Sequence, residues 1–203
     1  MAERGLLVDY GGVLTSDVFA AFNVFCDAEG LPHDAVRDLF RHDPRARDLL
    51  ARLETGELDT PGFEAQFAPL LGVEPERLVE RLFAAMQPDA TMLAAVAAAK
   101  AQGVRTGLVS NSWGAGEVYD RERFPELFDA VVISGEVGLR KPDPAIYRLA
   151  ADQLDLPPDR LVFVDDLPGN LKAARAMGMV TIAHRSAEHT VAELERALGV
   201  SLR

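Results

Sequence analysis

Five short apolar runs, rich in Val, Leu and Ile, constrain the fold of this chain most strongly. They occupy residues 5–9, 104–111, 130–134, 161–166 and 179–183. Runs that are apolar at successive positions are typical of strands in a parallel sheet, because such strands are buried on both faces. Helical patterns lie between and after them, at 88–103, 143–156, 169–178 and 186–199. This alternation predicts an α/β fold, a doubly wound parallel sheet with helices on both faces.

The connection after the first run is too long for a simple strand-to-helix link. Roughly 90 residues separate it from the next clear strand, whereas such connections are normally short. Residues 15–87 contain no convincing strand, but they contain amphipathic patterns such as "DVFAAFNVFCDAEG" and "EPERLVERLFAAM". We therefore predict a helical cap over residues 15–87, inserted into a core formed by residues 1–14 and 88–203. Apolar positions of the cap, such as Phe63 and Phe67, are expected to pack against one another.

Composition excludes several classes of function. A length of 203 residues suits one core with a modest insertion. The formal net charge of -11, without any block of basic residues, would repel nucleic acid. The single cysteine, Cys26, cannot form an intrachain disulfide, and its apolar neighbours predict burial. Because no apolar run is long enough for a membrane span and the first residues do not resemble a secretory signal, we expect a cytoplasmic protein without nucleic-acid or membrane partners.

Reactive side chains stand where three of the predicted strands end. The first run ends on Asp9, the second on Ser110 and Asn111, and the fourth on Asp165 and Asp166. In a doubly wound sheet, ligands bind beyond the carboxyl ends of the strands. We therefore expect these side chains to meet on one rim of the sheet.

Three carboxylates on one rim need a counter-charge. Asp165 and Asp166 cannot both be ionised at a buried strand end without one, since like charges at close range raise a pKa. Mg2+ accepts hard oxygen ligands from carboxylates, a backbone carbonyl and water, and it can neutralise a bound phosphate. Lys141, in "GEVGLRKPDPAIY", precedes the helix that leads into the fourth strand and would add an ammonium. The pattern predicts a Mg2+ site beside a phosphate site.

Asp9 suits two roles in such a site, metal ligand and nucleophile. A carboxylate can attack phosphorus to give an aspartyl-phosphate that water later hydrolyses, provided that the phosphoryl charge is neutralised. Mg2+, Lys141 and the Ser110 hydroxyl would neutralise it. Gly11 and Gly12 would let backbone N–H and C=O groups approach the anion and the metal. Singly, each residue also has an ordinary explanation as a turn former, a helix cap or a solvated lysine; their order at successive strand ends favours chemistry.

Four segments resemble the motifs of a known family, the haloacid dehalogenase-like hydrolases. They are "LLVDYGGVL", "GLVSN", "GLRKPDPAIY" and "LVFVDDLPGNLKAARAMGM". The resemblance covers the whole chain and is nearest to the phosphatase domains of soluble epoxide hydrolases. It implies a Rossmann-like core with a helical cap after the first strand. It also implies a Mg2+-dependent phosphatase acting on a small phosphorylated metabolite. The sequence leaves a monomer and a homodimer both open.

The resemblance assigns roles to individual residues. Asp9 would be the nucleophile, with Ser110 and Lys141 as phosphate binders. Asp166, helped by Asp165, would anchor Mg2+. The backbone carbonyl of Gly11 would be a further metal ligand beside Asp9, and Gly11, Gly12 and Asn111 are expected to contact the substrate.

Gly11 departs from the family pattern. Phosphatases of the family usually carry a second aspartate two residues after the nucleophile, as general acid and base. Losing such a catalyst costs about a hundredfold or more in rate. Three explanations stay open: a nearby group such as Asp17 substitutes, the substrate has a good leaving group such as an anomeric or acyl phosphate, or phosphate is bound without turnover.

Two alternative functions follow from Gly11. A 2-haloacid dehalogenase needs no proton for halide departure, but it also needs no metal. Dehalogenases of the family resemble one another in replacing the acidic pair of the fourth motif, whereas this chain keeps Asp165 and Asp166, so a phosphatase is favoured. The other alternative is a non-catalytic module that binds a phosphorylated metabolite.

Two further segments fall near the expected site. Trp113, Gly114 and Gly116 follow Ser110 closely, and we expect them in a loop, either a plain one or one at the mouth of the pocket. Glu54 and Gly56 fall where cap loops of related proteins approach the active site.

Overall fold

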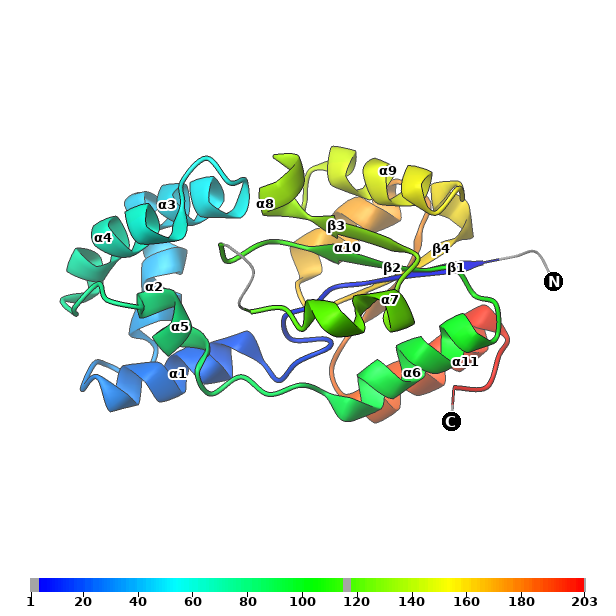
Figure 1. Ribbon diagram of the computed structural model, residues 1–203, viewed down its shortest axis with the longest axis horizontal. Helices are drawn as coiled ribbons and strands as arrows, with labels where there is room; N and C mark the ends of the chain where they lie inside the picture. Colours follow the sequence, from blue (N-terminus) through cyan, green and yellow to red (C-terminus); the bar gives the residue numbers. More distant parts are fainter. Residues whose placement is uncertain (1–3, 115–117, 203) are drawn as a thin grey trace.

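A five-stranded parallel sheet lies at the centre of the core (Figure 1). The structure, a computed structural model, describes residues 4–114 and 118–202. The strands are β1 (Gly5–Val8), β2 (Thr106–Ser110), β3 (Ala130–Ile133), β4 (Leu161–Asp165) and β5 (Val180–Ala183). Their order is β3-β2-β1-β4-β5, and every neighbouring pair is parallel. The predicted doubly wound α/β fold is confirmed, and each of the five apolar runs contains one strand.

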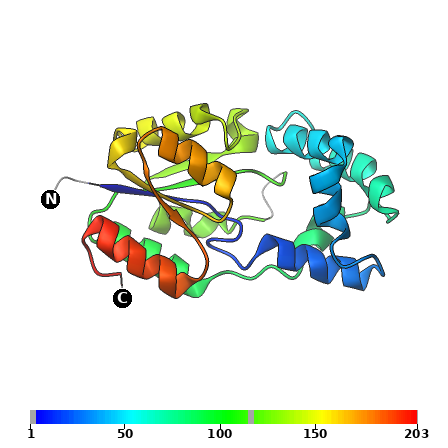
Figure 2. The ribbon, with the colours of Figure 1, turned by 180° about the vertical axis from the view of Figure 1, so that it is seen from behind.

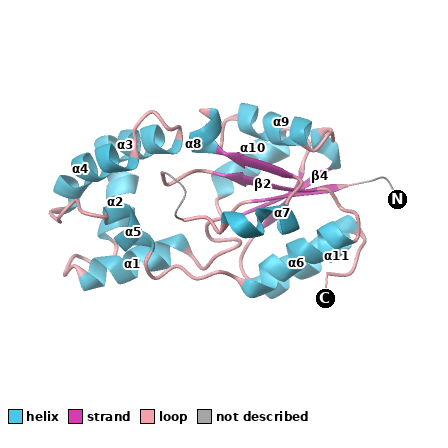
Figure 3. Cartoon of the chain, viewed as in Figure 1, coloured by secondary structure: helices cyan, strands magenta, loops and turns pink. Residues whose placement is uncertain are grey.

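Helices fill the segments between the strands (Figure 3). The α-helices are α1 (Val18–Ala28), α2 (Ala35–His42), α3 (Pro44–Glu54), α4 (Thr60–Leu71), α5 (Leu78–Phe83), α6 (Ala90–Ala101), α7 (Phe124–Leu127), α8 (Ser134–Val137), α9 (Pro144–Gln153), α10 (Pro168–Ala176) and α11 (Ala187–Leu198). Two short 3-10 helices are η1 (Arg121–Arg123) and η2 (Pro158–Arg160). Over the described ranges, none of these helices combines the length and the apolar character that a membrane span requires.

The central strand shows why the sheet is buried on both faces. Leu6 and Val8 pack with residues of α6, α7 and α11, whereas Leu7 packs with residues of α9 and α10. Figures 1 and 2 show these two groups of helices on opposite faces of the sheet. Because successive side chains of a strand point to opposite faces, an uninterrupted apolar run is what this position requires. Burying each such side chain stabilises the fold by about 1.5–3 kcal/mol.

Helices α1 to α5 lie together at one end of the molecule, beyond the carboxyl end of β1 (Figure 1). They pack around an apolar cluster of their own, which contains Cys26, Phe63 and Phe67 as fully buried residues. The two phenylalanine rings stack with centroids 4.9 Å apart. The chain enters and leaves this group along paired backbone, where Ser16 N donates to Gln87 O at 2.7 Å. The placement of the domain boundaries at residues 15 and 87 stays a prediction.

Aspartates begin five of the longer helices. The side chains of Asp17, Asp43, Asp59, Asp89 and Asp143 accept hydrogen bonds from backbone N–H groups of the first turns of α1, α3, α4, α6 and α9. Such caps contribute about 1 kcal/mol each. They account for part of the acidic excess of the chain without assigning it a binding function.

Candidate active site

The turn after β1 requires glycine at one position. Asp9 follows Val8, the last residue of the strand, and its Oδ1 accepts a hydrogen bond from Tyr10 N at 2.7 Å. Gly12 has φ +72°, and a Cβ placed on it would lie 2.7 Å from Asp166 Oδ2. Only a residue without a side chain lets the turn approach the end of β4 this closely. The N–H of Gly12 donates to Thr15 Oγ1 at 3.1 Å, so it holds the turn.

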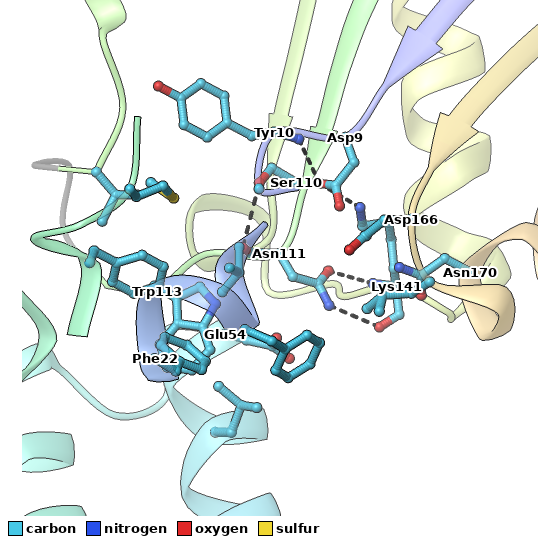
Figure 4. A pocket seen from close by; sticks show the side chains of 18 of the residues that line it. Asp9, Tyr10, Phe22, Glu54, Ser110, Asn111, Trp113, Lys141, Asp166 and Asn170 are labelled. Atoms are coloured by element: carbon cyan, nitrogen blue, oxygen red, sulfur yellow. Dashed lines mark hydrogen bonds and ion pairs between the residues drawn. The ribbon is translucent and has the colours of Figure 1, made fainter. Parts of the chain in front are cut away.

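Lys141 lies between the carboxylates of Asp9 and Asp165, and Figure 4 shows its contact with Asp9. Its Nζ is 2.7 Å from Asp9 Oδ1 and 2.7 Å from Asp165 Oδ2, and the residue is 1% exposed. Asp165 also accepts hydrogen bonds from Leu167 N at 2.8 Å and from Asn170 Nδ2 at 3.0 and 3.1 Å. Both oxygens of Asp165 are therefore engaged, and they orient the ammonium toward Asp9.

Residues at the end of β2 hold the loop that carries Lys141. Asn111 Nδ2 donates to Lys141 O at 3.1 Å, and Lys141 N donates to Asn111 Oδ1 at 2.8 Å. The amide of Asn111 thus clamps the backbone of Lys141, in addition to lining the pocket. Ser110 Oγ lies 3.0 Å from the hydroxyl of Tyr119, which is also buried. The sequence did not point to Tyr119, because its position depends on the fold of a loop.

Of the four predicted metal ligands, the three carboxylates come together. One oxygen from each of Asp9, Asp165 and Asp166 lies within 4.8 Å of the other two. Asp9 makes its contacts with Tyr10 N and Lys141 Nζ through Oδ1. Within the described part of the chain, this leaves Asp9 Oδ2 and the Asp166 carboxylate without a donor from another residue. Hard carboxylate oxygens in such a cluster fit Mg2+.

Burial and the charges of neighbouring groups shift the pKa values of Asp9, Asp166 and Lys141. Burial raises the pKa of Asp9 to about 7; Lys141 opposes this shift, and Asp165 adds to it. Burial, followed by the charge of Asp165, raises the pKa of Asp166 to about 6. Burial alone would lower the pKa of Lys141, but Asp9 and Asp165 raise it overall. One ammonium therefore does not balance three carboxylates, and a divalent cation would relieve the excess negative charge.

The pocket above these groups has a polar floor and an apolar wall. Its floor contains Asp9, Ser110, Lys141 and other strand-end residues of the core. Its wall is formed mainly by apolar side chains of α1, α2, α3, α5 and the segments after α5 and β2, namely Val18, Phe19, Phe22, Phe40, Leu50, Phe83, Met86, Trp113 and Val118. A molecule bound here would place a charged end on the core and an apolar end against this wall.

Trp113 joins the two parts of the pocket. It lines the pocket, and its ring lies 5.3 Å from that of Phe22 and 5.1 Å from that of Phe83. Of the other residues in its predicted loop, Gly114 packs against Thr60 outside this pocket, and Gly116 lies outside the described residues.

Glu54 reaches the same pocket from α3. The residue is 5% exposed, and Arg140 Nη2 lies 2.5 Å from its Oε2. Burial raises the pKa of Glu54 to about 7, although Arg140, Asn111 and Lys141 each lower it. Gly56 approaches the core beside it, where an added Cβ would lie 2.6 Å from Gly135 O. Asp17, by contrast, is exposed and begins α1, and it does not line the pocket.

Comparisons with known proteins show the family and the fold of the chain. A model of the haloacid dehalogenase-like hydrolase family matches residues 3–178. Bifunctional epoxide hydrolase 2 of Rattus norvegicus is 36% identical over 129 residues, which are 60% of this chain and 23% of that protein. A sesquiterpene phosphatase of Aspergillus oryzae is 34% identical over 116 residues, covering 56% of this chain and 59% of that protein. The alignments thus span less than two thirds of either relative.

A solved structure shares the fold over most of its length. An L-2-haloacid dehalogenase superposes with a TM-score of 0.65 at 25% identity, covering 92% of this chain and 87% of that chain. This fold therefore occurs in a dehalogenase, whereas the sequence is also similar to that of a phosphatase. Because the family model matches residues 3–178, most of this chain, the chain belongs to the haloacid dehalogenase-like hydrolases.

Proposed function

We propose that this protein is a Mg2+-dependent phosphatase that hydrolyses a small phosphorylated metabolite through an aspartyl-phosphate on Asp9. The observation that carries the proposal is the arrangement around Lys141. Its ammonium holds Oδ1 of Asp9, while Oδ2 of Asp9 and the Asp166 carboxylate have no donor from another described residue. A nucleophilic oxygen, a fixed positive charge and spare hard ligands are the parts that phosphoryl transfer needs.

Each residue of the floor has a role in this reaction. Asp9 Oδ2 attacks phosphorus, and the bond from phosphorus to the ester oxygen breaks on the opposite side. Lys141 stabilises the charge on the phosphoryl oxygens, and Ser110 donates its hydroxyl hydrogen to one of them. Asn111 keeps the Lys141 backbone in place through its two hydrogen bonds. Water then attacks phosphorus and releases phosphate from Asp9.

The metal ligands that we propose are Asp9, Asp166 and the backbone carbonyl of Gly11. Asp165 belongs to the same cluster, but its oxygens already accept hydrogen bonds from Lys141 and Asn170. We therefore propose that Asp165 mainly orients Lys141. Bound Mg2+ would neutralise charge on the phosphoryl oxygens.

The apolar wall limits the class of substrate that fits the pocket. Phosphate on the floor would place the leaving group among the aromatic side chains of the wall, so an alkyl, aryl or isoprenoid alcohol fits better than a sugar. The relative named as a sesquiterpene phosphatase is consistent with this class. Residues 15–87 would act as the cap that excludes water from the pocket.

Three measurements on purified protein test the proposal. Hydrolysis of p-nitrophenyl phosphate is followed with Mg2+, with chelator, and for Asp9→Asn. We expect activity that requires both Mg2+ and Asp9. The dehalogenase alternative predicts halide release from 2-chloropropionate that survives chelator, and the binding-module alternative predicts Mg2+-dependent stabilisation by phosphate without any turnover. Either of those outcomes, without phosphatase activity, would overturn the proposal.

A further inference from the structure

Glu54 faces the pocket from the side opposite Asp9. Among the described residues that line the pocket, the carboxylates are Asp9, Asp166 and Glu54, and the first two stand at strand ends of the core. Figure 4 shows Glu54 beside Phe22, across the pocket from Asp9. In an in-line displacement, the departing oxygen leaves on the face of phosphorus opposite the nucleophile. For a phosphate bound to Asp9 on the floor, the departing oxygen would leave toward the side of the pocket that carries Glu54.

The backbone of Glu54 is fixed to the core. Its carbonyl accepts a hydrogen bond from Ser134 Oγ, which in turn accepts one from Ser112 N at 2.7 Å. The backbone of Gly56 also lies close to that of Gly135 of the core, where an added Cβ on Gly56 would lie 2.6 Å from Gly135 O. The end of α3 therefore presents the side chain at a defined position, as a group that must meet a reacting atom requires.

The carboxylate of Glu54 is buried and paired with Arg140. Arg140 Nη2 lies 2.5 Å from Oε2, and the Asn111 side chain also lowers the pKa of Glu54. The charge of Lys141 also lowers the pKa of Glu54. The carboxylate of Glu136, on the neighbouring helix α8, is paired with Arg121. The balance of burial against these charges gives a pKa of about 7, so both protonation states are populated at neutral pH.

We infer that Glu54 performs the proton transfers for which Gly11 provides no side chain. The inference rests on the proposed phosphatase function. In the first step, a bond forms between Asp9 Oδ2 and phosphorus, the bond from phosphorus to the alcohol oxygen breaks, and that oxygen takes the proton of Glu54. In the second step, the oxygen of water bonds to phosphorus, the bond to Asp9 breaks, and the proton of the water passes to the Glu54 carboxylate. The two steps return Glu54 to its starting state.

Other candidates fit this role less well. Asp17 is exposed and occupied at the start of α1. The hydroxyl of Tyr119 interacts with Ser110, and burial raises the pKa of Tyr119, which makes it a weaker acid. At Gly11, an added Cβ would lie 3.0 Å from Val18 Cγ2 and, chain neighbours apart, would meet nothing else within 4 Å among the described residues, so a small shift of Val18 would admit a side chain there.

The test compares two leaving groups in Glu54→Gln, with Glu57→Gln as a matched control at an exposed position of the next loop. With hexyl phosphate, whose leaving group needs a proton, kcat of Glu54→Gln should fall about a hundredfold. With p-nitrophenyl phosphate, the single-turnover release of p-nitrophenol should stay within a few-fold of wild type. Glu54→Gln should also lose the decline of kcat above neutral pH, and Gly11→Asp in the Glu54→Gln background should restore activity on hexyl phosphate.

A second variant separates proton transfer from a structural role of the ion pair. Arg140→Gln removes a charge that lowers the pKa of Glu54, so the decline of kcat should move to higher pH while kcat at pH 6 is retained. Equal losses in Arg140→Gln and Glu54→Gln, with unchanged pH profiles, would overturn the inference. So would unchanged hexyl phosphate activity in Glu54→Gln. Wild-type protein inactive on both esters would instead refute the proposed function, and the inference with it.

Discussion

Replacing Lys141 by Met tests the charge balance on which the site depends. The variant keeps a side chain of similar length but removes an ammonium that lies 2.7 Å from both Asp9 and Asp165. Removing one partner of a buried ion pair costs about 3–5 kcal/mol, because the other charge stays buried without compensation. Since two carboxylates lose their partner here, we expect a loss of about 5 kcal/mol in the free energy of unfolding at pH 8.

The loss should depend on pH. Lys141 lowers the pKa of Asp9 and of Asp166, so its removal raises both, and the folded variant binds more protons than the folded wild type. Each additional bound proton reduces the loss by about 1.4 kcal/mol per pH unit as the pH falls. Urea unfolding in chelator at pH 8 and pH 5.5 measures the loss in the free energy of unfolding caused by Lys141→Met. Lys172→Met, at an exposed position, is the control. A loss that is below about 1 kcal/mol at pH 8, or equal at both pH values, would refute the reasoning.

Two further predictions concern the carboxylates. The pKa of Asp9 is about 7 and that of Asp166 about 6, both above the ordinary value of 3.8, so the folded state binds more protons than the unfolded state between these values. Metal-free protein should therefore melt at a higher temperature at pH 5.5 than at pH 8, and Mg2+ should raise the melting temperature at pH 8; calorimetry showing neither would contradict the account. Gly12→Ala should cost about 1–2 kcal/mol of stability for its positive φ. It should also weaken Mg2+ binding about tenfold or more in titration calorimetry, since its Cβ would displace Asp166; unchanged affinity would exclude Asp166 as a ligand.

The floor of the site was predictable from the sequence because it is a property of the sheet. Parallel strands end on one edge, so Asp9, Ser110 and Asp165 meet there once the strands are recognised. The local apolar pattern also predicted that Phe63 and Phe67 of the helical segment pack against one another. Both inferences need only the periodicity of residues that are near one another in the chain.

The wall of the site was not predictable in the same way. Glu54 lies at the end of an ordinary amphipathic helix, and its burial arises only when that helix meets Gly135 and Ser134 of the core. The contact of Tyr119 with Ser110 depends likewise on the fold of a loop. Asn111 was expected to contact the substrate, and its hydrogen bonds to the Lys141 backbone add a supporting role that sequence spacing does not reveal. Contacts between distant segments, rather than local pattern, determine these features.

The central claim is that Asp9 carries the phosphoryl group during turnover. Protein mixed with p-nitrophenyl phosphate and Mg2+ would be quenched in acid within milliseconds, and the peptide that contains Asp9 examined by mass spectrometry. The account predicts a phosphoryl adduct on Asp9 in the wild type and none in Asp9→Asn, which should also be inactive. Turnover by wild type without an adduct at Asp9, together with activity retained in Asp9→Asn, would contradict it.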